Sequence, residues 1–528
     1  MRATTVSQAM ALAGLVTLAA CGGGGGGGAA SAPSIVAPVA PPAVTPPVVA
    51  PPVVTPPVVA PPAVQEPVTF ANASVHDPAV INAGGTFYVF GSHLAAAKST
   101  DLMSWTRVAD GANAANPLFA DVTKALAATF AWAQTTTLWA PEVVQLADGK
   151  FYMYYNACKG DSPRSALGVA VADKIEGPYV DKGIILKSGM WGEISEDGKN
   201  IYDATRHPNT VDPNVFRDKD GGLWMVYGSY SGGIFILALD GATGMPKPGQ
   251  GYGKHLLGGN HARIEGANVL YHPQTGYYYL FTSFGGLDAN GAYNMRVARS
   301  RSPDGPYVDA KGTDMATVKS NPALPLFDDA SIAPHGQKLM GNHRFELAAG
   351  ETGTPLGYVS AGHNSVYYDA ATKQGFIVFH TRFPGLGEQH ELRVHELFVN
   401  EDGWPVVAPF RYAPLGKATP AQAASVSAAE AAGSYKMINH GKDISTTLKL
   451  SQNIKLNADG TLGGAVTGKW AHKGANNMSL TLDAGAAGAG SYSGVLSRQW
   501  NSNAGAYVVT FTAQSADGVS LWGARTGN

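Results

Sequence analysis

Cysteine, charge and helical periodicity are all scarce in this sequence of 528 residues. It has two cysteines, Cys21 and Cys158, and 14% charged residues, with a formal net charge of −2. Because no basic stripe is present, the sequence lacks the electrostatic footprint of a nucleic-acid-binding protein. Outside the N-terminus, strand and turn signals dominate over any helical repeat. The sequence therefore predicts an all-β protein that acts on neutral molecules and binds no nucleic acid.

Residues 1–21 have the pattern of an export signal. Arg2 precedes an apolar run from about Met10 to Ala20, which is too short to span a bilayer in the mature protein. The run ends in Leu18-Ala19-Ala20-Cys21, which resembles a bacterial lipobox. We expect a lipoprotein signal peptide with Cys21 as the lipidated residue, and an ordinary signal peptide is the alternative. The protein would then be exported and held at the cell surface or outer membrane only through this lipid anchor, or released from it.

Residues 22–67 form a predicted tether. A glycine run is followed by proline-rich repeats such as TPPVVAPPVV, and no charged residue occurs between Cys21 and Glu66. Such sequences favour an extended polyproline II chain that rises ~3.1 Å per residue, so the segment is expected to act as a spacer. If Cys21 is lipidated, Cys158 has no disulfide partner, and we expect a buried, inert thiol.

One pattern occurs five times between residues 77 and 381. Each copy has a leading polar residue, a short apolar run, a turn, and an aromatic-rich strand that ends in a polar residue; the leading residues are Asp77, Glu142, Asp212, Glu265 and His363. In an antiparallel hairpin, facing residues have the turn at the midpoint of their numbers. This arithmetic places one small polar residue beside each leading residue, in order Ser92, Asn156, Ser229, Ser283 and Thr381. Some of these should contact substrate and others should only satisfy the backbone.

The repeats predict the fold. Several copies add a third strand and a closing turn, such as Gly177-Pro178-Tyr179 and Gly305-Pro306-Tyr307, so each unit resembles a four-stranded propeller blade. We therefore expect a five-bladed β-propeller over residues 68–414, with all five leading residues at its axis; a large sandwich is the alternative. Short alternating segments in residues 415–528 predict a small antiparallel β-barrel or sandwich.

Three leading carboxylates suggest a reaction. Hydrolysis of an acetal needs one carboxylic acid to protonate the leaving oxygen and a second carboxylate to activate water or attack. A third carboxylate near the acid raises the pKa of that acid by like-charge repulsion. Asp77, Asp212 and Glu265, brought to one axis, would supply all three groups.

A series of motifs in a fixed order carries a family resemblance. The motifs are VHDPAVI, FGSHLAAAKSTDLMSW, LWAPEV, TVDPNVF, WMVYGSYSGGI, RIEGANVLY, KLMGN and AGHNSVYYD. From about Val68 to Pro414 the sequence closely resembles glycoside hydrolase family 43, in particular the larger two-domain endo-α-1,5-L-arabinanases. The resemblance implies hydrolysis of α-1,5-linked L-arabinofuranose in arabinan, a plant cell-wall polysaccharide, and we expect a monomer.

The resemblance also implies roles for single residues. Asp77 would be the general base, Glu265 the general acid, and Asp212 the residue that tunes the pKa of Glu265. The family inverts the anomeric centre, so base and acid should stand about 6.5–9.5 Å apart to admit a water molecule. His363 matches the histidine of a hydrated calcium site, in which water supplies most of the ligands; an ordinary packed histidine is the alternative.

Other axial residues have less specific predictions. Trp139 is expected to stack on a sugar ring or to pack in the core, and Asn156 and Ser229 are expected to contact substrate. Glu142 shares the leading position, but the resemblance gives it no catalytic step, so a structural role is favoured.

Three other functions remain open from the sequence. A related family member could cleave xylan or another arabinose-containing glycan. A non-catalytic, glycan-binding surface lipoprotein would equally explain the lipobox and tether, although it would not need all three acids. A retaining propeller enzyme of the fructan-cleaving type would differ in product stereochemistry.

Overall fold

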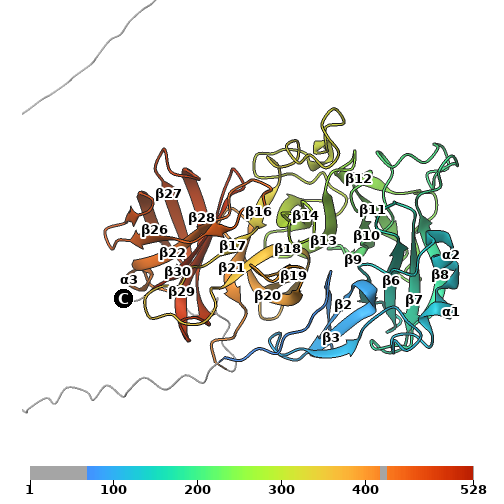
Figure 1. Ribbon diagram of the computed structural model, residues 1–528, viewed down its shortest axis with the longest axis horizontal. Helices are drawn as coiled ribbons and strands as arrows, with labels where there is room; N and C mark the ends of the chain where they lie inside the picture. Colours follow the sequence, from blue (N-terminus) through green and yellow to red (C-terminus); the bar gives the residue numbers. More distant parts are fainter. Residues whose placement is uncertain (1–67, 417–424, 527–528) are drawn as a thin grey trace, which may run out of the picture. The chain divides into compact units, whose positions relative to one another are not determined.

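The strands of residues 68–411 form five four-stranded antiparallel blades. A computed structural model describes residues 68–416 and 425–526. Blade 1 consists of β1 (Ala79–Ala83), β2 (Thr86–Gly91), β3 (Ala95–Ser99) and β4 (Thr106–Ala109). Figure 1 shows the chain coloured from blue at the N-terminus to red at the C-terminus. The lipobox, Cys21 and the tether lie outside the described residues.

The other blades repeat this plan. Blade 2 is β5 (Glu142–Gln145), β6 (Phe151–Cys158), β7 (Ser165–Ala172) and β8 (Val180–Lys187); blade 3 is β9 (Asn214–Arg217), β10 (Leu223–Tyr227), β11 (Ile234–Leu239) and β12 (Lys254–Leu257). Blade 4 is β13 (Ile264–His272), β14 (Tyr277–Phe284), β15 (Asn294–Ser300) and β16 (Gln337–Met340). Blade 5 is β18 (Gly357–Asp369), β19 (Gln374–Arg382), β20 (His390–Val399) and β21 (Pro405–Arg411), extended by β17 (His343–Arg344) and β23 (Lys449–Leu450).

Short helices are confined to connections among the described residues. They are α1 (Val122–Ala125), α2 (Ala127–Ala133) and α3 (Ala428–Ala431), with the 3-10 turns η1 (Ser92–Leu94) and η2 (Met315–Thr317). None of the helices in the part of the chain that the structure describes has the length and apolarity that a membrane crossing requires.

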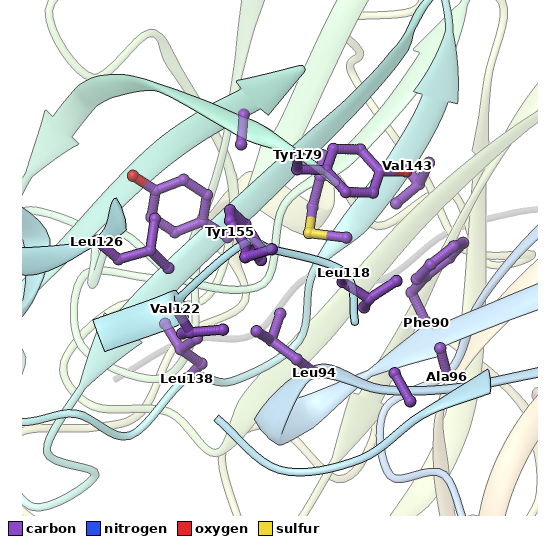
Figure 2. Close-up of a cluster of buried hydrophobic side chains, with 14 of the residues drawn as sticks. Phe90, Leu94, Ala96, Leu118, Val122, Leu126, Leu138, Val143, Tyr155 and Tyr179 are labelled. Carbon is purple, nitrogen blue, oxygen red and sulfur yellow. The ribbon is translucent and has the colours of Figure 1, made fainter. Parts of the chain in front are cut away.

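Apolar clusters between neighbouring blades hold the ring together. Between blades 1 and 2, Phe90 and Leu94 pack with Leu118, Val143 and Tyr155, as Figure 2 shows. A further cluster joins blade 5 to blade 1 and includes Val89, Trp105, Phe376 and Val394. The ring is therefore closed by burial of side chains between its first and last blades, and the predicted five-bladed propeller is confirmed.

The C-terminal region forms a closed eight-stranded barrel. Its strands are β22 (Gly433–Asn439), β24 (Gln452–Leu456), β25 (Thr461–Gly464), β26 (Gly468–Gly474), β27 (Asn477–Leu482), β28 (Gly490–Asn501), β29 (Ala506–Ser515) and β30 (Ser520–Arg525), and β22 pairs with β30 to close it. Propeller strands end at Arg411 and barrel strands begin at Gly433, so the boundary expected at 415 falls between them. The predicted barrel is confirmed.

Barrel and propeller share a core. Ile438 and Trp522 of the barrel belong to the same buried cluster as Phe345 and Phe410 of the propeller part. The Lys338 ammonium donates to the carbonyl oxygens of His440 (2.9 Å) and Asp443 (2.7 Å). Strand β23, from the barrel region, pairs in parallel with β17. The barrel therefore supports blade 5 directly.

The midpoint arithmetic holds for some hairpins and fails for others. Glu265 faces Ser283 as expected. In blade 1 the ladder ends with Ala79 facing Phe90, and just beyond it the Ser92 hydroxyl donates to the Asp77 carboxylate, which agrees with the arithmetic. In blade 2, however, Glu142 faces Tyr154 rather than Asn156, because residues 146–150 form the turn and its centre lies at Asp148.

The registers of blades 3 and 5 also differ from the arithmetic. The pairing of Val226 with Asn214 centres that hairpin on residue 220, so the predicted partner Ser229 is one position out. In blade 5, two bulges between Val359 and Ser365 insert extra residues, and Gly362 faces His380. A bulge adds a residue to one strand only, which midpoint arithmetic cannot include.

Candidate active site

Four of the five leading residues line one cavity at the propeller axis. The cavity has a volume of 510 Å³, and its walls include Asp77, Asp212, Glu265 and His363 together with Trp139 and Ser229. Asp77, Asp212 and His363 adopt left-handed backbone conformations, with φ of 55°, 54° and 43°. Such conformations are uncommon outside glycine and gather at functional sites, where the surrounding structure holds them.

Glu142 lies outside this cavity. It lines a second, separate pocket at the inner strands of the blades, and its carboxylate accepts a hydrogen bond of 3.0 Å from the Asn214 side chain. Burial raises the pKa of Glu142 to about 8. This placement agrees with a structural role.

Asp77 lies in a ring of hydrogen-bond donors. Its carboxylate contacts His76 Nδ1 at 2.8 Å and His363 Nδ1 at 3.1 Å, and it accepts a hydrogen bond from the Ser92 hydroxyl. Burial alone would raise the pKa of this carboxyl, but the charges and hydrogen bonds of His363 and His76 together hold it well below its usual range. Asp77 is therefore ionised at neutral pH.

Glu265 has the opposite environment. Ser229 Oγ donates to Oε2 at 2.7 Å and Tyr293 Oη donates to Oε1 at 2.9 Å, and the glutamate is 7% exposed. Burial raises the pKa of Glu265, and the negative charge of Asp77 adds to this, against the lowering effects of His363, Ser229 and Tyr293. Glu265 therefore holds a proton to higher pH than an ordinary glutamate does.

Asp212 is coupled to Glu265. Burial raises the pKa of Asp212 to about 8, and the neighbouring charges of Glu265 and Asp77 contribute to the rise. The backbone N–H of Gly266, the residue after Glu265, donates to the Asp212 carboxylate. Because two close buried carboxyls resist ionising together, Asp212 and Glu265 are expected to share a proton.

His363 compensates the negative charge of the cavity. Its backbone N–H donates to Ser283 Oγ at 2.8 Å, which fixes the position of the imidazole. Although burial lowers the pKa of His363, the three carboxylates outweigh it and raise the pKa to about 9, with Asp77 contributing most. The imidazole beside Asp77 therefore favours its positively charged form.

The described residues around His363 do not form a calcium cage by themselves. Calcium takes six to eight oxygen ligands, whereas the group here with metal-binding geometry is His76, Asp77 and His380, two imidazoles and one carboxylate within 4.8 Å of one another. Only Asp77 of these offers the hard oxygen that calcium prefers, and its oxygens already accept hydrogen bonds. The protein would therefore contribute few ligands to calcium, and no chemical step is assigned to a metal.

The remaining predicted contacts divide into two groups. Trp139 and Ser229 line the cavity, and Trp139 Nε1 donates to the Cys158 carbonyl at 2.7 Å. Asn156 is fully buried, and its amide donates to the Ala140 carbonyl at 2.6 Å, so its side chain serves the backbone. Cys158 is a free, buried thiol, as expected.

Several residues of the site were not predicted from the sequence. Tyr293 is 1% exposed and precedes β15 rather than a leading position, so the repeat gave no signal for it. His380 accepts a hydrogen bond of 3.2 Å from the Asp77 backbone N–H. His380 is directly before the predicted Thr381, and the bulges of β18 bring His380 to the axis in its place.

The cavity holds Asp77 with a lowered pKa and Asp212 and Glu265 with raised pKa values. This is the acid–base arrangement of a glycoside hydrolase. Sequence comparison agrees with this class. A family model described as glycosyl hydrolases family 43 matches residues 65–330, and a model described as a C-terminal lipocalin-like domain matches residues 409–523.

Individual relatives match over almost their whole length. The extracellular endo-α-(1→5)-L-arabinanase 2 of Bacillus subtilis is 57% identical over 457 residues, which are 86% of this chain and 94% of that protein. The extracellular endo-α-(1→5)-L-arabinanase of Thermotoga petrophila is 50% identical over 87% of this chain and 94% of its own length. A crystal structure of endo-1,5-α-L-arabinanase from Thermotoga petrophila has a TM-score of 0.82 at 48% identity, covering 88% of this chain and all of that one. The chain belongs to glycoside hydrolase family 43, as the sequence motifs predicted.

Proposed function

We propose that this protein is an endo-acting hydrolase of α-1,5-linked L-arabinan that inverts the anomeric centre. The observation that carries the proposal is the pairing, in one buried cavity, of Asp77 with a lowered pKa and Glu265 with a raised pKa. Two relatives that match 94% of their own length carry the name of this activity. Net charge near zero suits a neutral polysaccharide.

In the proposed reaction, Glu265 protonates the leaving oxygen while Asp77 takes a proton from the attacking water. The histidines that contact Asp77 favour its ionised form. Asp212 acts on Glu265 rather than on substrate, because two close buried carboxyls resist ionising together and the pair retains a proton. One water displaces the leaving group directly, so the product has the inverted configuration.

The test is sugar release from linear arabinan by wild type and by Glu265→Ala. We expect rapid appearance of mixed oligosaccharides with wild type and a loss of at least about a hundredfold in kcat/KM with the variant, since general acid catalysis contributes 10²–10⁴-fold. Wild-type turnover in Glu265→Ala would refute the assignment. Early release of one short product alone would refute endo action.

We further propose that the mature protein is exported and anchored by a lipid on Cys21, and that it is a monomer. Both relatives are named extracellular, which supports export, and the lipobox sequence supports the anchor. Growth with radiolabelled palmitate tests the anchor: wild type should be labelled and Cys21→Ala should not. Light scattering of a variant lacking residues 1–67 tests the monomer.

A calcium ion at His363, coordinated mainly by water, is a final proposal. It is supported by the three carboxyls that line the cavity with His363, because a divalent ion would offset their negative charge when the imidazole is neutral and free to bind it. Metal analysis of the purified protein should give about one calcium per chain, and less in His363→Ala. Absence of calcium from both would refute it.

A further inference from the structure

One loop at the cavity carries apolar side chains that the fold does not bury. The loop comprises residues 321–333, between η2 and β16, and is called the rim loop here. Within it, Leu326 is 66% exposed and Phe327 is 47% exposed, yet both line the cavity that contains the carboxylates. Exposed apolar side chains at the wall of a polar cavity indicate a binding surface rather than a core.

The backbone holds the Phe327 ring in place at an energetic cost. Phe327 has a φ of 67°, in the left-handed region that bulky residues rarely adopt. Its ring meets the Tyr230 ring edge to face, with 5.7 Å between centroids. A strained conformation that presents an aromatic ring to a cavity points to a function for that ring.

The rim loop is fastened on the Glu265 side of the cavity. Arg263 contacts Asp329 of the loop through two guanidinium nitrogens. Arg263 directly precedes β13, and Glu265 is the second residue of that strand. Tyr230, which supports the Phe327 ring, donates its backbone N–H to the Ile264 carbonyl at 3.0 Å. The charge of Glu265 contributes to the raised pKa of Tyr230, so this tyrosine lies close to the acid.

This location identifies the part of the substrate that the loop would meet. The general acid protonates the oxygen of the leaving group, so the sugar beyond the cleaved bond lies on the side of the acid. Arabinofuranose presents C–H groups on its ring faces, and aromatic and aliphatic side chains are suitable partners for such faces.

We propose that Leu326 and Phe327 form the subsite for the leaving-group sugar. The inference rests on the proposed arabinan hydrolysis and names the side chains that hold the sugar beyond the cleaved bond. Phe327 binds the substrate in this account and takes no part in proton transfer.

The test compares Phe327→Ala with Phe327→Tyr and Trp191→Ala. Trp191 is a matched control because it is 53% exposed and also packs edge to face on a tyrosine, Tyr202, but lies outside the cavity wall. With linear arabinan, Phe327→Ala should raise KM about tenfold, as expected for one lost aromatic contact, with kcat within about twofold. Phe327→Tyr and Trp191→Ala should stay near wild type.

Bond selection gives a second readout. Reducing-end-labelled arabino-oligosaccharides of defined length should be cleaved at the same bonds by Phe327→Ala as by wild type but less efficiently, because every productive binding mode places a sugar in the leaving-group subsite. Unchanged KM, a changed distribution of cleaved bonds, or an equal effect of Trp191→Ala would overturn the inference.

A folding defect and a failure of the proposed function can be told apart from these results. Phe327→Gly removes the ring and relieves the positive φ, so it should lose affinity like Phe327→Ala while its Tm is equal to or above that of wild type. Wild-type affinity in Phe327→Gly would overturn the inference. If wild-type enzyme does not cleave arabinan, the proposed function fails; if it does and Phe327→Ala is unchanged, only the inference fails.

Discussion

The hydroxyl of Tyr293 offers a sharp test of the acid assignment. It donates to Glu265 Oε1 at 2.9 Å inside the protein, where water does not compete. A hydrogen bond to a charged group contributes about 1.5–3 kcal/mol, and about 1.4 kcal/mol corresponds to one pKa unit. Since this bond stabilises the ionised carboxylate, Tyr293→Phe should raise the pKa of Glu265 by roughly one unit, with the Ser229 hydrogen bond still present.

The assay is the pH dependence of kcat/KM on linear arabinan. Glu265 must be protonated to act as acid, so activity falls as the pH rises through its pKa, and Tyr293→Phe should move this alkaline limb upward by about one pH unit. Tyr279→Phe is the matched control, because Tyr279 is a buried tyrosine of the same blade whose hydroxyl donates to the Gly403 carbonyl instead. An alkaline limb that stays in place or moves to lower pH in Tyr293→Phe would refute the reasoning.

Two further predictions concern stability. Burial raises the pKa of Glu142 to about 8 in the folded protein, so folding favours its protonated form, and the contribution of this group to stability is lost as the pH rises from its unfolded pKa toward 8. Glu142→Gln should therefore be more stable than wild type at pH 8, by on the order of 1–3 kcal/mol, and nearly equal to it at pH 4. Urea unfolding at both pH values would check this. An equal difference at the two pH values would contradict this assignment. Truncation before Leu415 should lower the Tm by at least about 10 °C or abolish soluble expression. The reason is that the truncation uncovers the core shared with Trp522 and leaves Lys338 without its carbonyl partners. A truncated propeller with wild-type Tm would show that the barrel is dispensable for folding.

The repeat predicted the architecture because it depends on patterns that the local sequence contains. Alternating apolar runs and turn residues define each hairpin, and the leading residues Asp77, Asp212, Glu265 and His363 meet in one cavity as expected. The repeat could not separate Glu142 from the others, because all five occupy the same position in the pattern. In the structure Glu142 faces a different pocket, where Asn214 satisfies it.

Residues contributed by irregular segments were beyond this approach. Tyr293 and Phe327 lie on connections between strands, where no period relates sequence to direction, and their importance arises from contacts with Glu265 and Tyr230 across the cavity. His380 reached the axis through bulges in β18, which leave no clear mark on the sequence. Side chains at leading positions were thus predictable, while those positioned by loops and bulges required the structure.

Product stereochemistry tests the central claim most directly, since it depends on one base, one acid and a single displacement. Proton NMR during cleavage of an α-1,5-linked arabino-oligosaccharide would follow the first anomer released, before mutarotation equilibrates the products. With Asp77 as base and Glu265 as acid, the β-anomer should appear first. First release of the α-anomer would mean retention through a covalent intermediate, and would contradict the account.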